Sequence, residues 1–240
     1  MKKIIKITTT PWGKLKPKVD IFPIIYLIIV YGFIYVLPFG RNIVGTSWFD
    51  WLRKEDGPLE WLQFFFFLGA SLCSSIILWR NRKQSFNKQW LFWLVLAALC
   101  FFVAGEEISW GERITGFGID LVRNINEQGE SNIHNSEFFQ HTLLDPSIIS
   151  SSLFFGWLGW NYWPEIDAFP KRFHSLYFLP VALFYFYYDI SYASTIKQIR
   201  YDGEIFELLI SLGLLAHCWS SVISQQKQLE NQSHNEEAKS

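Results

Sequence analysis

The sequence predicts an all-α protein, a polytopic membrane bundle of about six transmembrane helices. Half of the 240 residues are hydrophobic and 19% are aromatic, a composition that soluble domains of this size rarely combine with several long apolar runs. Each run approaches the 20 or so residues that a helix needs to cross a bilayer. The runs lack the period-two alternation of barrel strands, so helices are the expected way to pair every backbone group in hydrocarbon.

The apolar runs divide the chain into three parts. Residues 1–20 form a basic cytoplasmic segment, residues 21–223 form the transmembrane domain, and residues 224–240 form a polar cytoplasmic tail that we expect to be solvated or disordered. No small-residue cleavage site follows the first run, which we therefore expect to remain as a span. The predicted spans cover residues 21–39, 58–79, 90–110, 146–163, 173–194 and 203–223.

The distribution of charge predicts the orientation. With the N-terminus inside, the inner segments hold 14 of the 21 basic residues but only 6 of the 22 acidic ones. An excess of Lys and Arg marks the cytoplasmic side of a membrane protein. We therefore predict a bacterial inner-membrane protein with both termini in the cytoplasm. Its expected partner is the lipid bilayer, and no nucleic acid is expected to bind.

Acidic segments meet the membrane on the outer side at the ends of three spans. They lie in residues 55–60 (EDGPLE), 105–113 (GEEISWGER) and 202–207 (DGEIFE). We expect four carboxylates, those of Glu60, Glu107, Glu204 and Glu207, to reach one pocket from different helices. Crowded carboxylates share protons or bind a divalent cation such as Ca²⁺, Mg²⁺ or Mn²⁺.

Glu106 and Glu107 follow the apolar core of the third span directly, where a charged side chain costs a few kcal/mol unless it finds a partner. If the helix continues through residue 113, then Glu106, Trp110 and Arg113 share one face, and Arg113 pairs with Glu106. Glu107 then points about 100° away, toward another helix. The alternative reading is an interfacial helix end held by ion pairs. For Glu60, a role at the helix start beside Pro58 is a sufficient alternative.

A long outer loop over residues 112–145 connects the third and fourth spans. Apolar residues at helical spacing predict an amphipathic helix over residues 114–125, lying on the outer leaflet. An amide- and acid-rich stretch follows, and it adds His134 as a candidate acid–base group or zinc ligand. No H-E-x-x-H and no paired C-x-x-C is present.

These observations define a hypothetical polar site. The candidate catalytic residues are Glu106, Glu107 and His134. The candidate binding residues are Glu60, Arg113, Asn126, Glu130, Asn135, Glu204 and Glu207. The candidate metal ligands are Glu107, His134 and Glu207, with a divalent cation as the possible cofactor.

Three segments resemble a bacterial family of multi-pass membrane proteins that has a GEEISWGQR-like motif and no assigned activity. They are EDGPLEW (Glu55–Trp61), GEEISWGERITGF (Gly105–Phe117) and NEQGESNIHN (Asn126–Asn135). In this chain Glu112 replaces the Gln of the motif. The acid pair is also similar to the EExxxR motif of CAAX-type membrane proteases, but position 111 is Gly where that motif has Arg.

Two function classes lead on this evidence. One is a metal-dependent membrane enzyme acting on a lipid or lipid-linked substrate. The other is a non-catalytic assembly or scaffold protein that binds a membrane-protein partner through its acidic outer face. A transporter is less favoured, because transporters place their polar groups near the bilayer midplane. A CAAX-type protease is also less favoured.

Overall fold

The structure is a computed structural model, and it is almost entirely helical. It describes residues 9–10, 13–14, 21–32, 46–53, 57–82, 87–118, 120–124, 142–190 and 197–237. Outside the helices, a two-residue strand β1 (Thr9–Thr10) pairs antiparallel with β2 (Gly13–Lys14). The all-α prediction is confirmed at this level.

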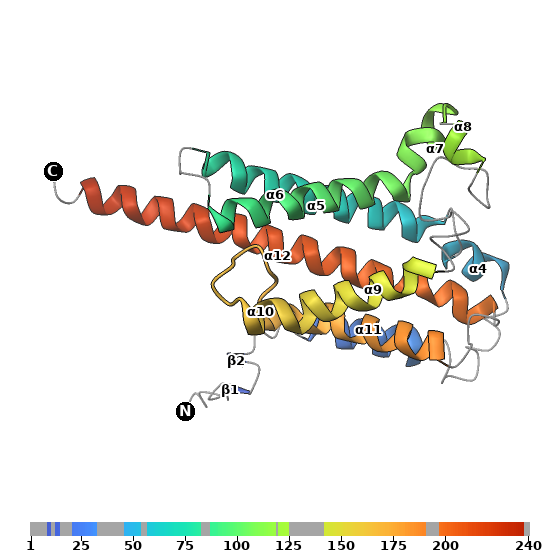
Figure 1. The fold of residues 1–240 in the computed structure, drawn as a ribbon. Helices are drawn as coiled ribbons and strands as arrows, with labels where there is room; N and C mark the ends of the chain where they lie inside the picture. The colour runs from blue at the N-terminus through green and yellow to red at the C-terminus, as the bar shows by residue number, and fades with distance from the viewer. Residues whose placement is uncertain are drawn as a thin grey trace.

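Three long helices run side by side along the molecule (Figure 1): α5 (Pro58–Arg80), α6 (Lys88–Glu107) and α12 (Lys197–Glu237). Helix α5 packs against both α6 and α12. Its start follows from the sequence, because Gly57 is the N-cap, Pro58 takes the first helical position and Glu60 lies in the first turn. There Pro58 loses no hydrogen bond, and the Glu60 carboxylate faces the free N–H groups.

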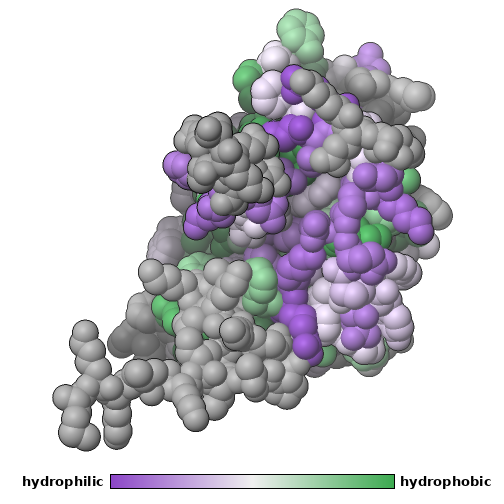
Figure 2. All heavy atoms as spheres, turned by 90° about the vertical axis from the view of Figure 1, so that its left-hand side faces the viewer, coloured by the Kyte–Doolittle hydropathy of each residue, from purple (hydrophilic) through white to green (hydrophobic). Residues whose placement is uncertain are grey.

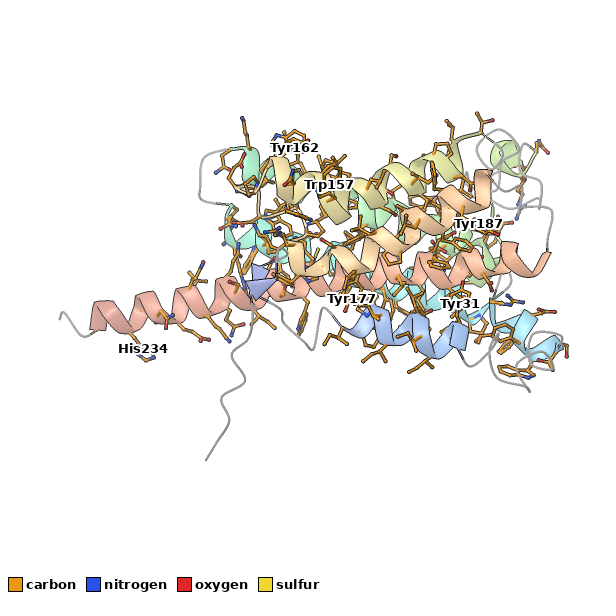
Figure 3. All side chains as sticks on the ribbon, turned by 90° about the horizontal axis from the view of Figure 1, so that it is seen from below. Tyr31, Trp157, Tyr162, Tyr177, Tyr187 and His234 are labelled. Atoms are coloured by element: carbon orange, nitrogen blue, oxygen red, sulfur yellow. The ribbon has the colours of Figure 1, made fainter. Side chains whose placement is uncertain are left out.

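A second group of helices covers the other side of α12. It contains a nearly continuous run made of α9 (Leu144–Leu153), the π-helical turn η4 (Phe154–Leu158) and α10 (Gly159–Tyr162). The turn η5 (Arg172–His174) then leads into α11 (Ser175–Ile190), which packs on both α9 and α12. Helix α2 (Phe22–Tyr31) lies against α11 (Figure 3), and the Phe22 ring stacks on the Tyr177 ring at a centroid distance of 6.4 Å.

The short helices gather at the end of the bundle opposite the C-terminus (Figure 1). They are α4 (Ser47–Arg53), η2 (Ser109–Gly111), α7 (Glu112–Thr115) and α8 (Asp120–Arg123). The other end is polar. Figure 2 looks onto that end and shows hydrophilic residues gathered around the point from which α12 protrudes.

The lateral surface of the bundle is rich in exposed apolar side chains, among them Ile28, Leu72, Phe101, Leu183 and Trp219. Contiguous apolar surface of this kind is typical of a face that contacts lipid or another protein. In the part of the chain that the structure describes, three segments are long and apolar enough to cross a membrane: Ser47–Arg80, which contains α4 and α5, then Lys88–Glu107 and Asp202–Asn231. Helix α2 is apolar but shorter.

The tail after residue 224, which we expect to be solvated or disordered, is helical as far as Glu237, because α12 continues to that residue. Nucleation is the costly step of helix formation. The apolar part of α12 is already helical, so the tail only has to extend an existing helix. The segment contains no Gly or Pro that would end the helix. The predicted solvation is observed, since the side chains here are mostly exposed and His234 projects from the protruding end of α12 (Figure 3).

Two further boundaries differ from the prediction. The third span ends at Glu107 and not at residue 110. The predicted amphipathic helix over residues 114–125 is interrupted, because α7 ends at Thr115 and α8 begins at Asp120. Gly116 adopts a left-handed conformation with φ of 72°, which caps α7 and turns the chain away from helical geometry.

Replacing Gly213 with Ala is expected to loosen the contact between α11 and α12. A Cβ atom at position 213 would lie 2.6 Å from Cβ of Tyr177, so one helix must shift. Overpacking of this kind costs about 1–3 kcal/mol of unfolding free energy. Gly32→Ala is the matched control, because nothing lies within 4 Å of its added Cβ. Thermal unfolding in detergent would compare the two variants, and equal melting temperatures would contradict this account of the packing.

Candidate functional site

The acidic ends of three long helices lie together at the end of the bundle that carries α4 and α7 (Figure 1). Glu60 opens α5, Glu107 closes α6, and Glu204 and Glu207 lie near the start of α12. Glu204 interacts electrostatically with each of the other three carboxyl groups. The four carboxylates therefore lie within electrostatic range of Glu204, and their expected convergence in one pocket stays a prediction. We call them the carboxylate cluster.

Gln63 of α5 connects the carboxylate cluster to α12. It lies one turn after Glu60, and its side chain is fully buried. Its amide Nε2 donates to Oε2 of Glu204 at 2.8 Å and to the Glu204 backbone carbonyl at 3.2 Å. The amide oxygen Oε1 has no hydrogen-bond partner among the residues that the structure describes. A buried acceptor without a partner costs about 1–3 kcal/mol, so this oxygen is available to accept from a ligand, a water or a protonated carboxyl group.

Tyr185 of α11 contributes the second uncharged partner. Its buried hydroxyl donates to Oε1 of Glu207. Gly203 makes room for it, since a Cβ atom at that position would lie 2.9 Å from the Tyr185 hydroxyl oxygen. The cluster thus receives side chains from α5, α6, α11 and α12.

The hydrogen bond described for Glu106 is to a residue outside the carboxylate cluster. Its Oε1 accepts a hydrogen bond of 2.6 Å from the indole Nε1 of Trp110. The expected helical stripe through Glu106, Trp110 and Arg113 does not form, because α6 ends at Glu107. The side chain of Arg113 lies outside the described residues, so its predicted pairing with Glu106 stays a prediction.

The chain after α6 makes a left-handed turn. Ser109, Trp110 and Gly111 all have positive φ, of 48°, 54° and 86°. For a non-glycine residue this conformation costs roughly 1–2 kcal/mol, and such strain persists only where surrounding contacts compensate for it. The turn folds Trp110 back onto the helix that precedes it. The turn also places residue 111 outside α6. This is the position of the Arg in the EExxxR motif of CAAX-type proteases, so the chain differs from that motif in backbone conformation as well as in residue type.

A buried ion pair adjoins the carboxylate cluster. Arg53 of α4 donates to Oδ1 of Asp202, two residues before Glu204, and its side chain is fully buried. Its guanidinium also lies 3.3 Å from Asp50 and 4.4 Å from the centre of the Phe49 ring. These contacts hold α4 against α12. In the sequence Arg53 is one of the basic residues of the predicted outer segments, and the aromatic SWFDWLR segment around it was the available signal of a packed helix.

Glu112 forms a second ion pair, between α7 and α8. It is the residue that departs from the motif of the resembling family, and it accepts from Nε of Arg123 at 2.7 Å. The hydrogen bond to Glu112 raises the pKa of the Arg123 guanidinium above its usual value. This pair connects α7 to α8.

Other predicted site residues are not tested. His134, Asn126, Glu130 and Asn135 all lie outside the described residues. Among the residues that are described, no group of three His, Cys, Asp or Glu side chains is arranged to hold a metal ion. Sequence reasoning missed Gln63 and Tyr185, which are uncharged, and Arg53, which is distant in the chain from its partner Asp202.

Comparison with known proteins adds no assignment, because no protein-family model, no curated protein and no solved structure matches the chain.

Replacing Asp202 with Asn is expected to destabilise the protein strongly. Removing the buried carboxylate from Arg53 should cost about 3–5 kcal/mol of unfolding free energy, as for other broken buried pairs. The control is Asp167→Asn, which breaks the exposed pair with Lys171 at 2.8 Å and should cost at most about 1 kcal/mol. Equilibrium unfolding in mixed detergent micelles would measure both, and similar losses for the two variants would contradict a structural role for the Arg53–Asp202 pair.

Proposed function

We propose that this chain is a six-span protein of the bacterial inner membrane whose outer end carries an acid–base site for a lipid or lipid-linked substrate. The observation that carries the proposal is the carboxylate cluster, in which Glu204 interacts with three other carboxyl groups and accepts a hydrogen bond from Gln63. Membership of the bacterial family with the GEEISWGQR-like motif stays a prediction.

The arrangement of the helices supports six spans. Three stretches are long and apolar enough to cross a bilayer. The run from Leu144 to Tyr162 is about 28 Å long at 1.5 Å per residue, close to the hydrocarbon thickness, and α11 runs beside it. Helix α2 provides the first span. The excess of basic residues on the inner segments supports cytoplasmic termini.

The contacts in the cluster support acid–base chemistry. Carboxylates crowded in a region of low polarity cannot all be ionised, so they share protons. Gln63 and Tyr185 hold Glu204 and Glu207 through hydrogen bonds without neutralising them. One carboxyl group can then donate a proton to a substrate while another accepts one, which is the arrangement used in general acid–base catalysis. The predicted divalent cation stays a prediction, since His134 is among the residues not described.

A scaffold function is the second candidate, and specific contacts favour it. Asp202 pairs with Arg53, Glu112 pairs with Arg123, and Glu60 lies at a helix N-terminus. Such local pairing is what an acidic docking face would show. The electrostatic neighbours described for Glu204 are instead other carboxyl groups, those of Glu207, Glu60 and Glu107. The enzyme proposal rests on this grouping around Glu204.

Replacing Glu204 with Gln is expected to abolish the activity while leaving the fold intact, because the amide oxygen still accepts from Gln63 but cannot transfer a proton. Infrared spectroscopy of the purified protein should show a protonated carboxyl band near neutral pH that is lost in the variant. Lipid extracts of expressing cells, compared by mass spectrometry, should contain a lipid species that depends on Glu204.

Glu230→Gln is the control for this experiment, because Glu230 is exposed on the protruding part of α12. It should change neither the infrared band nor the lipid profile. A wild-type protein without a protonated carboxyl band would contradict the acid–base site. An intact band with lipid profiles that are identical for Glu204→Gln and wild type would favour the scaffold function.

Single cysteines would test the six-span topology. The native cysteines Cys73, Cys100 and Cys218 are buried and should react slowly. A membrane-impermeant maleimide applied to intact spheroplasts should label Asp120→Cys from outside. It should label Asp167→Cys and His234→Cys only after permeabilisation. Labelling of Asp120→Cys and Asp167→Cys from the same side would contradict the topology.

A further inference from the structure

Trp110 is placed against the outer end of α6 by three independent features. The left-handed turn over Ser109–Gly111 reverses the chain, and the indole Nε1 then donates to Glu106 at 2.6 Å. The ring lies on Gly105, where an added Cβ would approach the ring carbons to 2.9 Å. Any larger residue at position 105 would push the ring away from the helix.

The ring lies on the lipid-facing side of α6. Phe101 and Phe102, both exposed, meet the Trp110 ring edge-on at centroid distances of 6.2 and 5.7 Å. Glu106 continues the exposed row through Leu99 and Phe102, at the spacing that places residues on one helix face. Despite this position Glu106 is only 5% exposed, whereas Trp110 is 44% exposed. The indole is therefore interposed between the Glu106 carboxylate and the surroundings of the helix.

We propose that Trp110 is a gate on the lipid-facing side of Glu106, and that displacement of its indole opens this carboxylate to amphiphiles of the outer leaflet. The inference rests on the proposed function and extends it to the substrate class. The substrate would be a lipid with a hydrogen-bond donor or cationic headgroup, which can replace the indole N–H as the partner of Glu106. Trp110 acts as a positioning residue, and Glu106 as the group that contacts the substrate.

A membrane-soluble carbodiimide tests the gate in the full-length protein in lipid vesicles. Dicyclohexylcarbodiimide partitions into hydrocarbon, where a protonated carboxyl group adds across its C=N bond and the adduct rearranges to a stable N-acylurea. Mass spectrometry then gives the rate of modification at each glutamate. At mildly acidic pH, loss of the indole and its charge-assisted hydrogen bond in Trp110→Ala should accelerate modification of Glu106 about tenfold.

Two further variants test whether faster modification comes from uncovering Glu106 or from a general loss of folded structure. Gly105→Ala keeps the tryptophan but displaces its ring, so it should also accelerate modification of Glu106. Trp110→Phe keeps a ring over the carboxylate without the N–H donor, so its rate should lie between those of wild type and Trp110→Ala. Trp48→Ala removes another exposed tryptophan at the same end of the bundle and should leave the rate unchanged.

The outcomes distinguish the gate from the acid–base site. Wild-type rates at Glu106 in both Trp110→Ala and Gly105→Ala would overturn the gate. Equal acceleration by Trp48→Ala would also overturn it, because the effect would then be general loosening. Failure of the acid–base site would appear in a different measurement. The wild-type protein would then lack the infrared band that Glu204→Gln is expected to remove, while Trp110→Ala would still accelerate the modification of Glu106.

Discussion

The close approach of α12 to its neighbours is the constraint on which the rest of the structure depends. Three glycines permit it. Gly213 meets the Cβ of Tyr177, Gly203 meets the hydroxyl of Tyr185, and Gly69 of α5 meets the side chain of Leu215. Small residues let helix backbones come together where hydrocarbon provides no hydrophobic driving force between them. Because α12 lies close to α5 and α11, Glu204 reaches Gln63 and Glu207 reaches Tyr185 near the start of α12.

The acids at that end have different partners, and the difference gives each one a distinct chemical role. Asp202 has the positive charge of Arg53, which holds it as a structural carboxylate. Glu207 accepts a hydrogen bond from the Tyr185 hydroxyl, and Glu204 accepts one from the Gln63 amide. Neutral donors fix the position of a carboxyl group while leaving its proton exchangeable, whereas a buried ion pair holds its carboxylate ionised.

The left-handed turn after α6 shows how strain is retained near such a site. Two non-glycine residues, Ser109 and Trp110, are held in a conformation that L-amino acids avoid. The compensating contacts are the hydrogen bond from Trp110 to Glu106 and the packing of the indole on Gly105. As a result, Glu106 and Glu107 have different surroundings although they are adjacent in the chain. Glu107 interacts with the cluster and Glu106 is covered by Trp110.

The sequence by itself determined the helical class, the start of α5 at Pro58 and the gathering of the acidic helix ends at one side. These features depend on local composition and on the requirement that backbone groups be paired in hydrocarbon, so periodicity and charge reveal them. Only the tertiary structure decided which side chains meet. Gln63, Tyr185 and Arg53 are partners of acids more than 20 residues away, and distances between helices depend on packing. The left-handed turn that ends α6 at Glu107 was also missed, because it depends on the contacts of Trp110 with Glu106 and Gly105.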